Sequence, residues 1–560
     1  MAKMTGRQAV MEVFRNERVR YVFGNPGTTE LPLLDALQDA PEMDYILCLH
    51  EGVALGMAQM YATASGKTGV ANLHVAPGVG NALGMLYNAW VGKTPMVVTA
   101  GQQDSRMLLR EPILSHDLVS MAKPLTKWAV QLQHAEEIPV LLPRVFKVAQ
   151  DPPRGPVFLS LPSNILDQEA DLEVPGPTAT YRRNRPDPAG VAAAAELLTR
   201  AANPVIICGD SVAASDAVEE LVRLAEALGA PVWNTVLMAQ MNFPFGHPQF
   251  RGELAAEYPT IRRLLGEPDA VLAVGADLFH EVFYGQGSPF PTGCALVHLD
   301  SSPWEIGKNL PAAVGLLADP KLGLVDLVEA LSARMDGTAQ AKAAERRAAM
   351  AGQKKTDQER QLQRAQKSRD ASPVTTARLM AALRECLPED VVIYSEAITA
   401  SADVVRSIPL VRPKSYFGNQ GGGIGQALPG ALGIQLALPD RPVVAVVGDG
   451  SSMYSIQSLW TAAHHKIPVV YVVLNNQSYR ILKFNMNRYR RETGAAGAKP
   501  YPAMDLADPA LDFVSIARGM GVEGRRITRP DEIRPAVLEA LSSKAPFVLD
   551  VATEGSVPAE

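Results

Sequence analysis

The stretch VVAVVGDGSSMYS, residues 443–455, is the part of the sequence that best indicates the fold. Its apolar run predicts a strand buried on both faces, and the glycines that follow predict a tight turn into a helix. Asp449 lies between Gly448 and Gly450, directly after that strand. One explanation is structural, because Asp is a common helix N-cap and glycine permits the turn. The other is chemical, because α/β sheets bind ligands at the carboxyl ends of their strands.

The sequence that follows favours the chemical explanation. A helical pattern over residues 455–465 precedes an apolar strand over residues 467–474, which leads into Asn475 and Asn476. Neighbouring parallel strands end at the same sheet edge, so Asp449 and Asn476 are expected to lie side by side. A carboxylate, an amide oxygen and a nearby loop carbonyl are hard oxygen ligands for Mg²⁺, which takes its remaining ligands from phosphates and water. Backbone amides at the start of the helix suit those phosphates.

Similar alternation of apolar runs and helical patterns continues along the whole chain. It predicts an α/β protein with three doubly wound parallel-sheet domains. The proline-rich stretch 174–190 and the polar, helical stretch 336–370 are interpreted as linkers. We therefore expect domains at residues 1–180, 190–333 and 373–560.

The first and third domains share a sequence pattern. Residues 70–98 align without a gap with residues 443–471, and both stretches have the pattern strand, Gly-rich turn, helix, Lys-x-Pro, strand. The Lys-x-Pro begins at Lys93 in one stretch and at Lys466 in the other. This similarity predicts that the two domains are a related pair that arose by duplication.

Composition argues against several classes of function. The 560-residue chain has a formal net charge of -6, whereas nucleic-acid binding requires a basic face. No apolar stretch approaches the ~18 residues of a membrane span, and the first residues lack the apolar core of a signal peptide. The 4 cysteines form no CxxC pair, which predicts a reducing cytoplasmic location and no zinc site.

A Gly-Asp-Gly followed about two dozen residues later by Asn-Asn resembles the signature of the thiamine diphosphate (ThDP) enzyme family. The resemblance extends over essentially the whole chain, and within the family it is strongest to the benzoylformate decarboxylase type. It implies a pyrimidine-binding domain, a middle domain and a diphosphate-binding domain. The matching stretches are residues 23–37, 72–90, 99–103, 448–463 and 474–479.

This resemblance assigns a cofactor site to the third domain. It implies Mg²⁺ ligands from Asp449, Asn476 and the backbone carbonyl of Ser478. It implies that Ser451 and Thr399 lie near the diphosphate. The remaining cofactor-binding residues that it implies beside them are Gly448, Gly450 and Tyr479.

The other half of the cofactor requires an acid. ThDP is activated through a carboxyl group at N1′ of its aminopyrimidine ring, and Glu51 is the candidate. An acid that opens a helix also complements the helix dipole, which is the structural alternative for Glu51. The resemblance implies the catalytic role, and it implies that Glu51 and Asp449 meet from different subunits. The protein is therefore expected to be a homo-oligomer, with a dimer of dimers favoured and the active site at the subunit interface.

The glycine-rich stretch 418–433 has two explanations. It could be a dinucleotide fingerprint, but it follows no strong strand and no acid stands at the required spacing. The resemblance implies instead that it grips the aminopyrimidine. Ile424 would bend the cofactor, with the stiffness of a β-branched side chain, and Gly422 would offer its carbonyl to the amino group.

Three residues are candidates for handling the substrate. His74 follows an apolar strand and matches a catalytic histidine of the family, although a lone histidine is more often structural. Thr28 stands where the benzoylformate enzyme has serine, and its hydroxyl would hold the substrate carboxylate. The second catalytic histidine of that enzyme aligns near Val282. His280, two positions away, either substitutes for it or is an unrelated surface histidine.

The stretch after the metal loop is bulkier than its counterpart in the benzoylformate enzyme. Ile481 would line the substrate pocket. Arg480 and Lys483 either meet an anionic substrate or are exposed loop cations. This divergence leaves the acyl group of the substrate open.

The leading interpretation is ThDP- and Mg²⁺-dependent, non-oxidative decarboxylation of a 2-oxo acid to an aldehyde and CO₂. The alternative is a carboligase or lyase on the same scaffold, similar to acetolactate synthase or to a 2-hydroxyacyl lyase. A non-catalytic relative is disfavoured, because Glu51 and all the metal ligands are retained.

Overall fold

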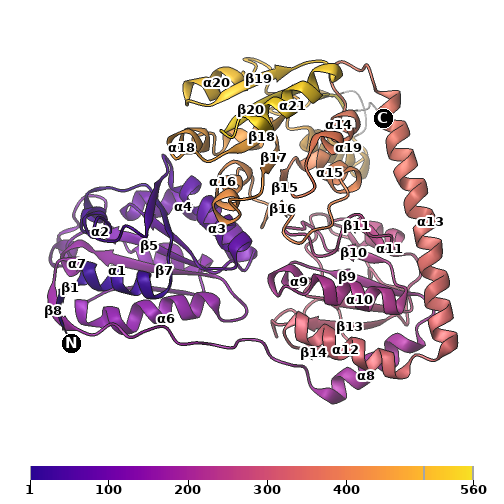
Figure 1. The fold of residues 1–560 in the computed structure, drawn as a ribbon, viewed down its shortest axis with the longest axis horizontal. Coiled ribbons are helices and arrows are strands. Elements are labelled where there is room, and N and C mark those ends of the chain that lie inside the picture. Colours follow the sequence, from indigo (N-terminus) through magenta and orange to yellow (C-terminus); the bar gives the residue numbers. More distant parts are fainter. Residues whose placement is uncertain (1, 496–498, 558–560) are drawn as a thin grey trace.

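A computed structural model describes residues 2–495 and 499–557 and contains three six-stranded parallel sheets. In Figure 1 the first domain is indigo to purple, the middle domain is magenta, and the third domain is orange to yellow. Helices cover both faces of each sheet, which confirms the predicted α/β class with three doubly wound domains. A short antiparallel pair, β1 (Ala2–Thr5) with β8 (Glu169–Leu172), closes one end of the first domain.

The first and third sheets have the same topology. Numbered along the chain within each domain, both have the strand order 2-1-3-4-6-5, which confirms that the two domains are a related pair. The first sheet contains β2 (Tyr21–Gly24), β3 (Asp44–Leu47), β4 (Gly69–Leu73), β5 (Met96–Gln102), β6 (Trp128–Gln131) and β7 (Pro156–Pro162). The third contains β15 (Val392–Glu396), β16 (Tyr416–Gly418), β17 (Val443–Gly448), β18 (Val469–Asn475), β19 (Glu523–Ile527) and β20 (Phe547–Ala552).

The middle sheet has a different order, 3-2-1-4-5-6 along the domain. This is the order of doubly wound sheets that bind ligands where the strand order reverses. Its strands are β9 (Pro204–Cys208), β10 (Val232–Asn234), β11 (Phe250–Glu253), β12 (Ala270–Val274), β13 (Ala295–Asp300) and β14 (Val314–Leu317). The domain boundaries proposed from the sequence stay a prediction.

Helices in each domain cover the sheets. The first domain has α1 (Gly6–Asn16), α2 (Leu31–Leu37), α3 (Glu51–Ser65), α4 (Val75–Val91), α5 (Leu118–Ala122), α6 (Ile138–Gln150) and α7 (Ser163–Leu166). The middle domain has α8 (Pro188–Arg200), α9 (Ser211–Ala214), α10 (Val218–Leu228), α11 (Tyr258–Leu265) and α12 (Pro320–Arg334). The third domain has α14 (Thr376–Cys386), α15 (Ser401–Ser407), α16 (Ala427–Ala437), α17 (Asp449–Met453), α18 (Ser458–His464), α19 (Arg480–Glu492), α20 (Phe513–Gly519) and α21 (Ile533–Ser542).

The two expected linkers differ in structure. The polar stretch forms one helix of 31 residues, α13 (Gly337–Lys367), which runs along the edge of the molecule beside the middle and third domains (Figure 1). Residues 173–187 form no regular element before α8. No helix in the described ranges is long and apolar enough to cross a membrane. All 4 cysteines are free thiols.

The first and third domains are joined by two helices that are apolar on all sides. Helices of this kind are stable only when they are buried, and α3 and α16 bury each other (Figure 1). Glycine permits their close approach, because a Cβ on Gly433 would lie 2.2 Å from the Met57 carbonyl oxygen and one on Gly56 would lie 2.7 Å from Pro429. One continuous apolar core therefore runs through both domains.

The contact between α3 and α16 gives the first testable prediction. The Gly433→Ala substitution should destabilise the chain by about 1–3 kcal/mol, because the backbone of α3 cannot yield to the added methyl group. Gly352→Ala is the matched control, since Gly352 lies in α13 and a Cβ added there would have nothing within 4 Å. Helix propensity should raise the stability of that variant by roughly 0.5–1 kcal/mol. Thermal unfolding of both variants checks this, and equal midpoints would contradict it.

Candidate active site

Two oxygen atoms of the predicted metal set lie at adjacent strand ends. β17 and β18 are parallel neighbours with Gly448 opposite Leu474, so Asp449 and Asn476 follow at the same edge, as the sequence predicted. Asp449 is the first residue of α17 and Gly448 is its N-cap, so the interpretation of Asp449 as the N-cap is wrong. The Asp449 Oδ1 atom accepts the N–H of Gly450 at 2.7 Å. The Oδ2 atom of Asp449 and the Oδ1 atom of Asn476 are buried and have no hydrogen-bond partner among the described residues.

This donor set fits a magnesium ion. A buried oxygen without a partner costs about 1–3 kcal/mol, and a cation between two such oxygens removes that cost. Burial raises the pKa of Asp449, while the backbone N–H groups of Gly450 and of residues 476–478 oppose the increase. Ser478 is buried beside this loop, where Gln477 adopts a left-handed φ of 53°. Within the described residues no three His, Cys, Asp or Glu side chains form a metal site, so an ion here would need further ligands from phosphate and water.

The other residues predicted for the third domain follow the ends of neighbouring strands. Ser451 is buried in α17, and Thr399 lies in a short 3₁₀ segment, Ile398–Ala400, after β15. The Tyr479 ring packs on Gly450, where a Cβ would approach it to 2.5 Å. Gly422, with φ of 83°, and half-buried Ile424 lie in the loop after β16. All these residues therefore lie at the carboxyl edge of the third sheet.

Glu396 is a residue of this site that the sequence interpretation missed. It is the last residue of β15, it is buried, and its carboxylate accepts the N–H groups of Gly425 and Ala427, both at 2.6 Å. It also accepts Nδ2 of Asn419 at 3.1 Å. Burial raises the pKa of Glu396 to about 7, although these hydrogen bonds oppose the increase. The carboxyl group thus fixes both ends of the glycine-rich loop. An acid at the end of an apolar strand was the available signal, as it was for Asp449.

Glu51 lies at the equivalent edge of the first sheet. It is the first residue of α3, and it is 5% exposed. Its Oε2 atom accepts Nδ2 of Asn81, on α4, at 3.0 Å. A Cβ on Gly78 would lie 3.0 Å from Oε1, so glycine leaves room for the carboxylate. The position also suits the helix dipole, so the two explanations for Glu51 are compatible.

His74 is held by a second acid that the sequence did not suggest. It is the N-cap of α4, and its Nδ1 atom lies 2.7 Å from Oε2 of Glu30, a side chain that is 1% exposed. Glu30 also accepts the N–H of Gly27 at 2.8 Å, and a Cβ on Gly27 would collide with the imidazole ring at 2.2 Å. No hydrogen bond engages Nε2 of His74 in the part of the chain that the structure describes. Thr28 is exposed next to this pair.

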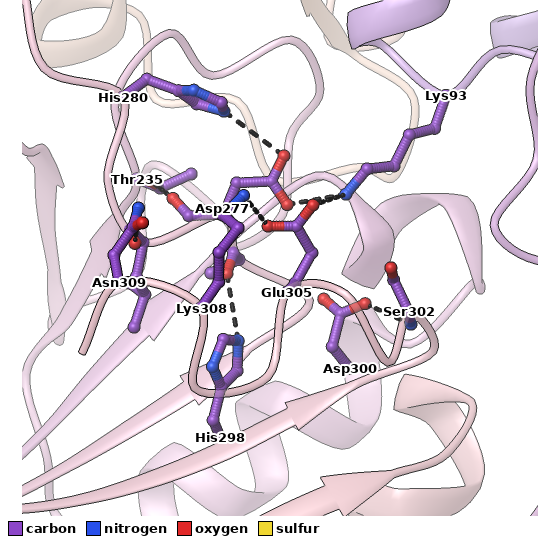
Figure 2. A network of polar contacts seen from close by, with 12 residues as sticks. Lys93, Thr235, Asp277, His280, His298, Asp300, Ser302, Glu305, Lys308 and Asn309 are labelled. Carbon is purple, nitrogen blue, oxygen red and sulfur yellow. Dashed lines mark hydrogen bonds and ion pairs between the residues drawn. The ribbon is translucent and has the colours of Figure 1, made fainter. Parts of the chain in front are cut away.

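His280 lies in a network of charged groups between the first and middle domains. Figure 2 shows its ring directed at Asp277, with Nε2 at 3.3 Å from Oδ2. Lys93, from the first domain, approaches Oδ1 of Asp277 at 2.7 Å and Glu305 at 3.4 Å. Burial alone would raise the pKa of Asp277, but the hydrogen bond with His280 and the charge of Lys93 together lower it. His280 thus has a structural partner, and its catalytic role stays a prediction.

The same network borders a cavity of about 510 Å³ at the carboxyl edge of the middle sheet. The cavity reaches from Arg154 and Asp300 to Gln420 and Gly421 of the glycine-rich loop. The Asp300 Oδ2 atom is buried without a partner, and burial raises the pKa of Asp300 to about 6 against the charge of Lys93. The cavity therefore joins the middle domain to the loop of the third domain.

Arg480 and Lys483 are neither loop residues nor unpaired. Both lie on α19, where Nε of Arg480 donates to the Ser556 carbonyl at 3.0 Å. Nζ of Lys483, which is buried, lies 2.5 Å from Oδ1 of Asp505. The prediction that they are exposed loop cations is therefore wrong. Ile481 is half-buried in the first turn of α19, and its place in a substrate pocket stays a prediction.

Comparison with known proteins agrees with this geometry. Profiles described as thiamine pyrophosphate enzyme match in three parts: the N-terminal TPP binding domain over residues 4–121, the central domain over 191–331 and the C-terminal TPP binding domain over 399–551. The chain belongs to the thiamine pyrophosphate enzyme family. Each of the three domains thus matches a domain of that family, and the predicted resemblance is confirmed.

Relatives with different names cover the whole chain. A benzoylformate decarboxylase of Pseudomonas aeruginosa is 34% identical over 99% of this chain and 100% of its own length. A probable acetolactate synthase large subunit of Methanocaldococcus jannaschii is 30% identical over 100% of this chain and 93% of its own. The structure of a thiamine diphosphate-dependent 4-hydroxybenzoylformate decarboxylase of Rhodococcus jostii RHA1 superposes with a TM-score of 0.85 at 31% identity, over 98% of this chain and 99% of that one.

The titration of Glu396 gives a second prediction. Because burial raises its pKa from 4.5 to about 7, the folded chain binds a proton here more tightly than the unfolded chain. The stability that Glu396 supplies is therefore complete below pH 4.5 and is lost as the pH rises through 7. The stability of the cofactor-free wild type, measured relative to that of Glu396→Gln, should therefore be greater at pH 5 than at pH 8.

Thermal unfolding of both proteins at the two pH values measures this difference. Glu329→Gln is the matched control, because Glu329 is exposed on α12 and its substitution should give no such pH trend. The opposite trend would mean that the three donors stabilise the Glu396 carboxylate enough to lower its pKa.

Proposed function

We propose that this protein is a ThDP- and Mg²⁺-dependent decarboxylase that converts a 2-oxo acid to an aldehyde and CO₂. The observation that carries the proposal is the pair of buried, unpartnered oxygens of Asp449 and Asn476 at the edge of a TPP-binding domain. The full-length similarity to a benzoylformate decarboxylase supports the reaction class.

The cofactor is assigned to named residues. Asp449, Asn476 and the Ser478 carbonyl would ligate Mg²⁺, and the amide groups at the start of α17 would bind the diphosphate. Ser451, Thr399, Gly448, Gly450 and Tyr479 would surround the diphosphate, while Gly422 and Ile424 would position the aminopyrimidine. Glu51 would share a proton with N1′ of that ring. When bound there, ThDP would supply the carbon nucleophile and the electron-accepting ring that decarboxylation of a 2-oxo acid requires.

Acid–base steps are assigned to the first domain. His74 would deliver the proton that replaces CO₂ on the product carbon, and Glu30 would hold its ring through Nδ1 so that Nε2 stays available. Thr28 would bind the substrate carboxylate through its hydroxyl. His280 remains a candidate for a second proton transfer.

In the proposed arrangement a second subunit would complete both clusters. Among the described residues no hydrogen bond or ion pair joins Glu51 or His74 to the metal set, although one cofactor would have to contact both. Large exposed apolar side chains flank the two clusters, and such surfaces mark contacts between chains. They are Leu49, two residues before Glu51, Ile398, next to Thr399, and Tyr454, directly after α17. We therefore propose a homodimer, or a dimer of dimers, with shared sites, acting in the cytoplasm on a small-molecule substrate.

Release of CO₂ from a panel of 2-oxo acids tests the function. Benzoylformate, 4-hydroxybenzoylformate, phenylpyruvate, pyruvate and branched 2-oxo acids are supplied with ThDP and Mg²⁺. At least one of them should give CO₂ and an equal amount of aldehyde. No CO₂ from any of them would contradict the decarboxylase assignment.

The carboligase alternative has its own support, the full-length similarity to a probable acetolactate synthase large subunit. In that case CO₂ would be released without free aldehyde, and a hydroxyketone or 2-hydroxy acid product would form instead. Product analysis by mass spectrometry on the same panel separates the two reactions.

Glu51→Gln gives a third prediction. It should lower turnover by roughly 10²-fold or more, because an amide cannot exchange a proton with N1′. The thermal midpoint should stay near that of the wild type, since a glutamine oxygen can still accept from Asn81. Glu329→Gln serves again as the exposed control. Near-normal CO₂ release by Glu51→Gln would remove Glu51 from the mechanism.

His74→Ala gives a fourth prediction. Turnover should fall by roughly tenfold or more on the best 2-oxo acid, which is the low side of what a general acid–base group supplies. His134→Ala, at an exposed position away from both clusters, should leave the rate unchanged. A rate for His74→Ala equal to that of the control would make His74 a structural residue.

A further inference from the structure

We propose that Asn88 is a positioning residue that clamps the glycine-rich loop and so holds Gly422 and Ile424 in place for the cofactor. The proposal rests on the function proposed for that loop. Asn88 belongs to α4 in the first domain, whereas the loop belongs to the third, and the contact lies within one chain.

The clamp has two points. Nδ2 of Asn88 donates to the carbonyl oxygen of Gly423 at 2.8 Å, and the N–H of Gly423 donates to Oδ1 of Asn88 at 3.0 Å. The asparagine side chain is fully buried. One amide group thus satisfies both backbone polar groups of one residue, as a neighbouring strand would. If Gly423 moved away, its N–H and the buried amide of Asn88 would lose their partners.

This contact explains the glycines at 421 and 423, and backbone conformation explains the glycine between them. A Cβ on Gly421 would lie 2.8 Å from Oδ1 of Asn88, and one on Gly423 would lie 2.7 Å from the same atom. Gly421 and Gly422 also have φ values of 81° and 83°, which favour glycine. The glycine-rich stretch, for which a dinucleotide fingerprint was one explanation, therefore binds the Asn88 amide.

Other contacts hold different parts of the loop. Gln59 donates to Gln420 at 2.6 Å at its start, and Glu396 accepts the N–H groups at its end. Asn419 also donates to the Gly423 carbonyl, at 2.8 Å. Within the described chain, however, only Asn88 accepts the N–H of Gly423, the residue between Gly422 and Ile424.

The position is a costly one for asparagine. Asn is a poor helix former, and a buried amide is unfavourable unless it is paired. In the described part of the chain the Asn88 amide binds the backbone of Gly423 and makes one further contact, at 3.7 Å, from Nδ2 to the Met85 sulfur. It binds no backbone group of α4, so the residue does not stabilise its own helix. The side chain therefore acts on the loop.

The test compares Asn88→Ala and Asn88→Asp with the wild type. The Asp variant keeps the volume and the acceptor for Gly423 N–H, but it replaces the donor with an oxygen that repels the Gly423 carbonyl. If Asn88→Ala fails to fold, Asn88→Asp alone tests the positioning role. Gln249→Ala is the matched control, because this buried amide also makes two bonds, to the carbonyls of Ala225 and Ala230, in the middle domain.

Two measurements are made. Amide hydrogen exchange over residues 418–426, without cofactor, should be faster in both Asn88 variants and unchanged in the control. With ThDP and Mg²⁺ bound, exchange of the thiazolium C2 proton should slow by roughly tenfold to a hundredfold in the Asn88 variants. The reason is that a small displacement of positioning groups lowers the rate of a reaction by such factors. The dissociation constant for ThDP should stay within about threefold, because the diphosphate end is untouched.

Three outcomes would overturn the inference. The first is amide exchange of the loop that is unchanged in both Asn88 variants. The second is C2-proton exchange within twofold of the wild-type rate. The third is a change of either rate in Gln249→Ala as large as that in the Asn88 variants. Failure of the wild type itself to bind ThDP would instead overturn the proposed function, so the two failures are distinguishable.

Discussion

The structure depends on two buried oxygens, Oδ2 of Asp449 and Oδ1 of Asn476, that have no partner in residues 2–495 and 499–557. Each such atom costs about 1–3 kcal/mol, which a folded chain tolerates where a ligand recovers it. Adjacent parallel strands bring the two atoms to one sheet edge, and the start of α17 lies beside them. This donor set fits a cation that would carry phosphate with it, and it lies in the part of the chain that matches a C-terminal TPP binding domain.

The second constraint follows from the proposed function, because the residues proposed for one cofactor lie in two separate groups of the chain. The first domain carries Glu51 and the His74–Glu30 pair, and the third carries the proposed metal ligands and the glycine-rich loop. Helix α4 links them: His74 is its N-cap, and Asn88, about 21 Å further along the helix axis, clamps the loop. If the groups are completed by a partner, this rigid helix connects one active site to the other. The buried contact of α3 with α16 keeps the two groups in a fixed relation.

Much of this was predictable from the sequence, because the relevant signals are local. Apolar runs that end in Asp449 and Asn476 predict both the strands and their shared edge, and the two similar stretches predict the common topology of the first and third sheets. Residues whose role depends on a distant partner could not be found this way. The role of Glu30 is evident only from its contact with His74. The roles of Glu396 and Asn88 are likewise evident only from their contacts with Gly425 and Gly423. The pairing of Lys483 with Asp505 likewise has no signal in the sequence of α19.

The most direct test of the central claim is calorimetric titration of the purified, metal-free protein with ThDP, with and without Mg²⁺, for the wild type and Asp449→Ala. The account predicts saturable binding near one ThDP per chain that requires Mg²⁺ and is lost in the variant. Binding that is independent of Mg²⁺, or equally strong without the Asp449 carboxylate, would contradict it.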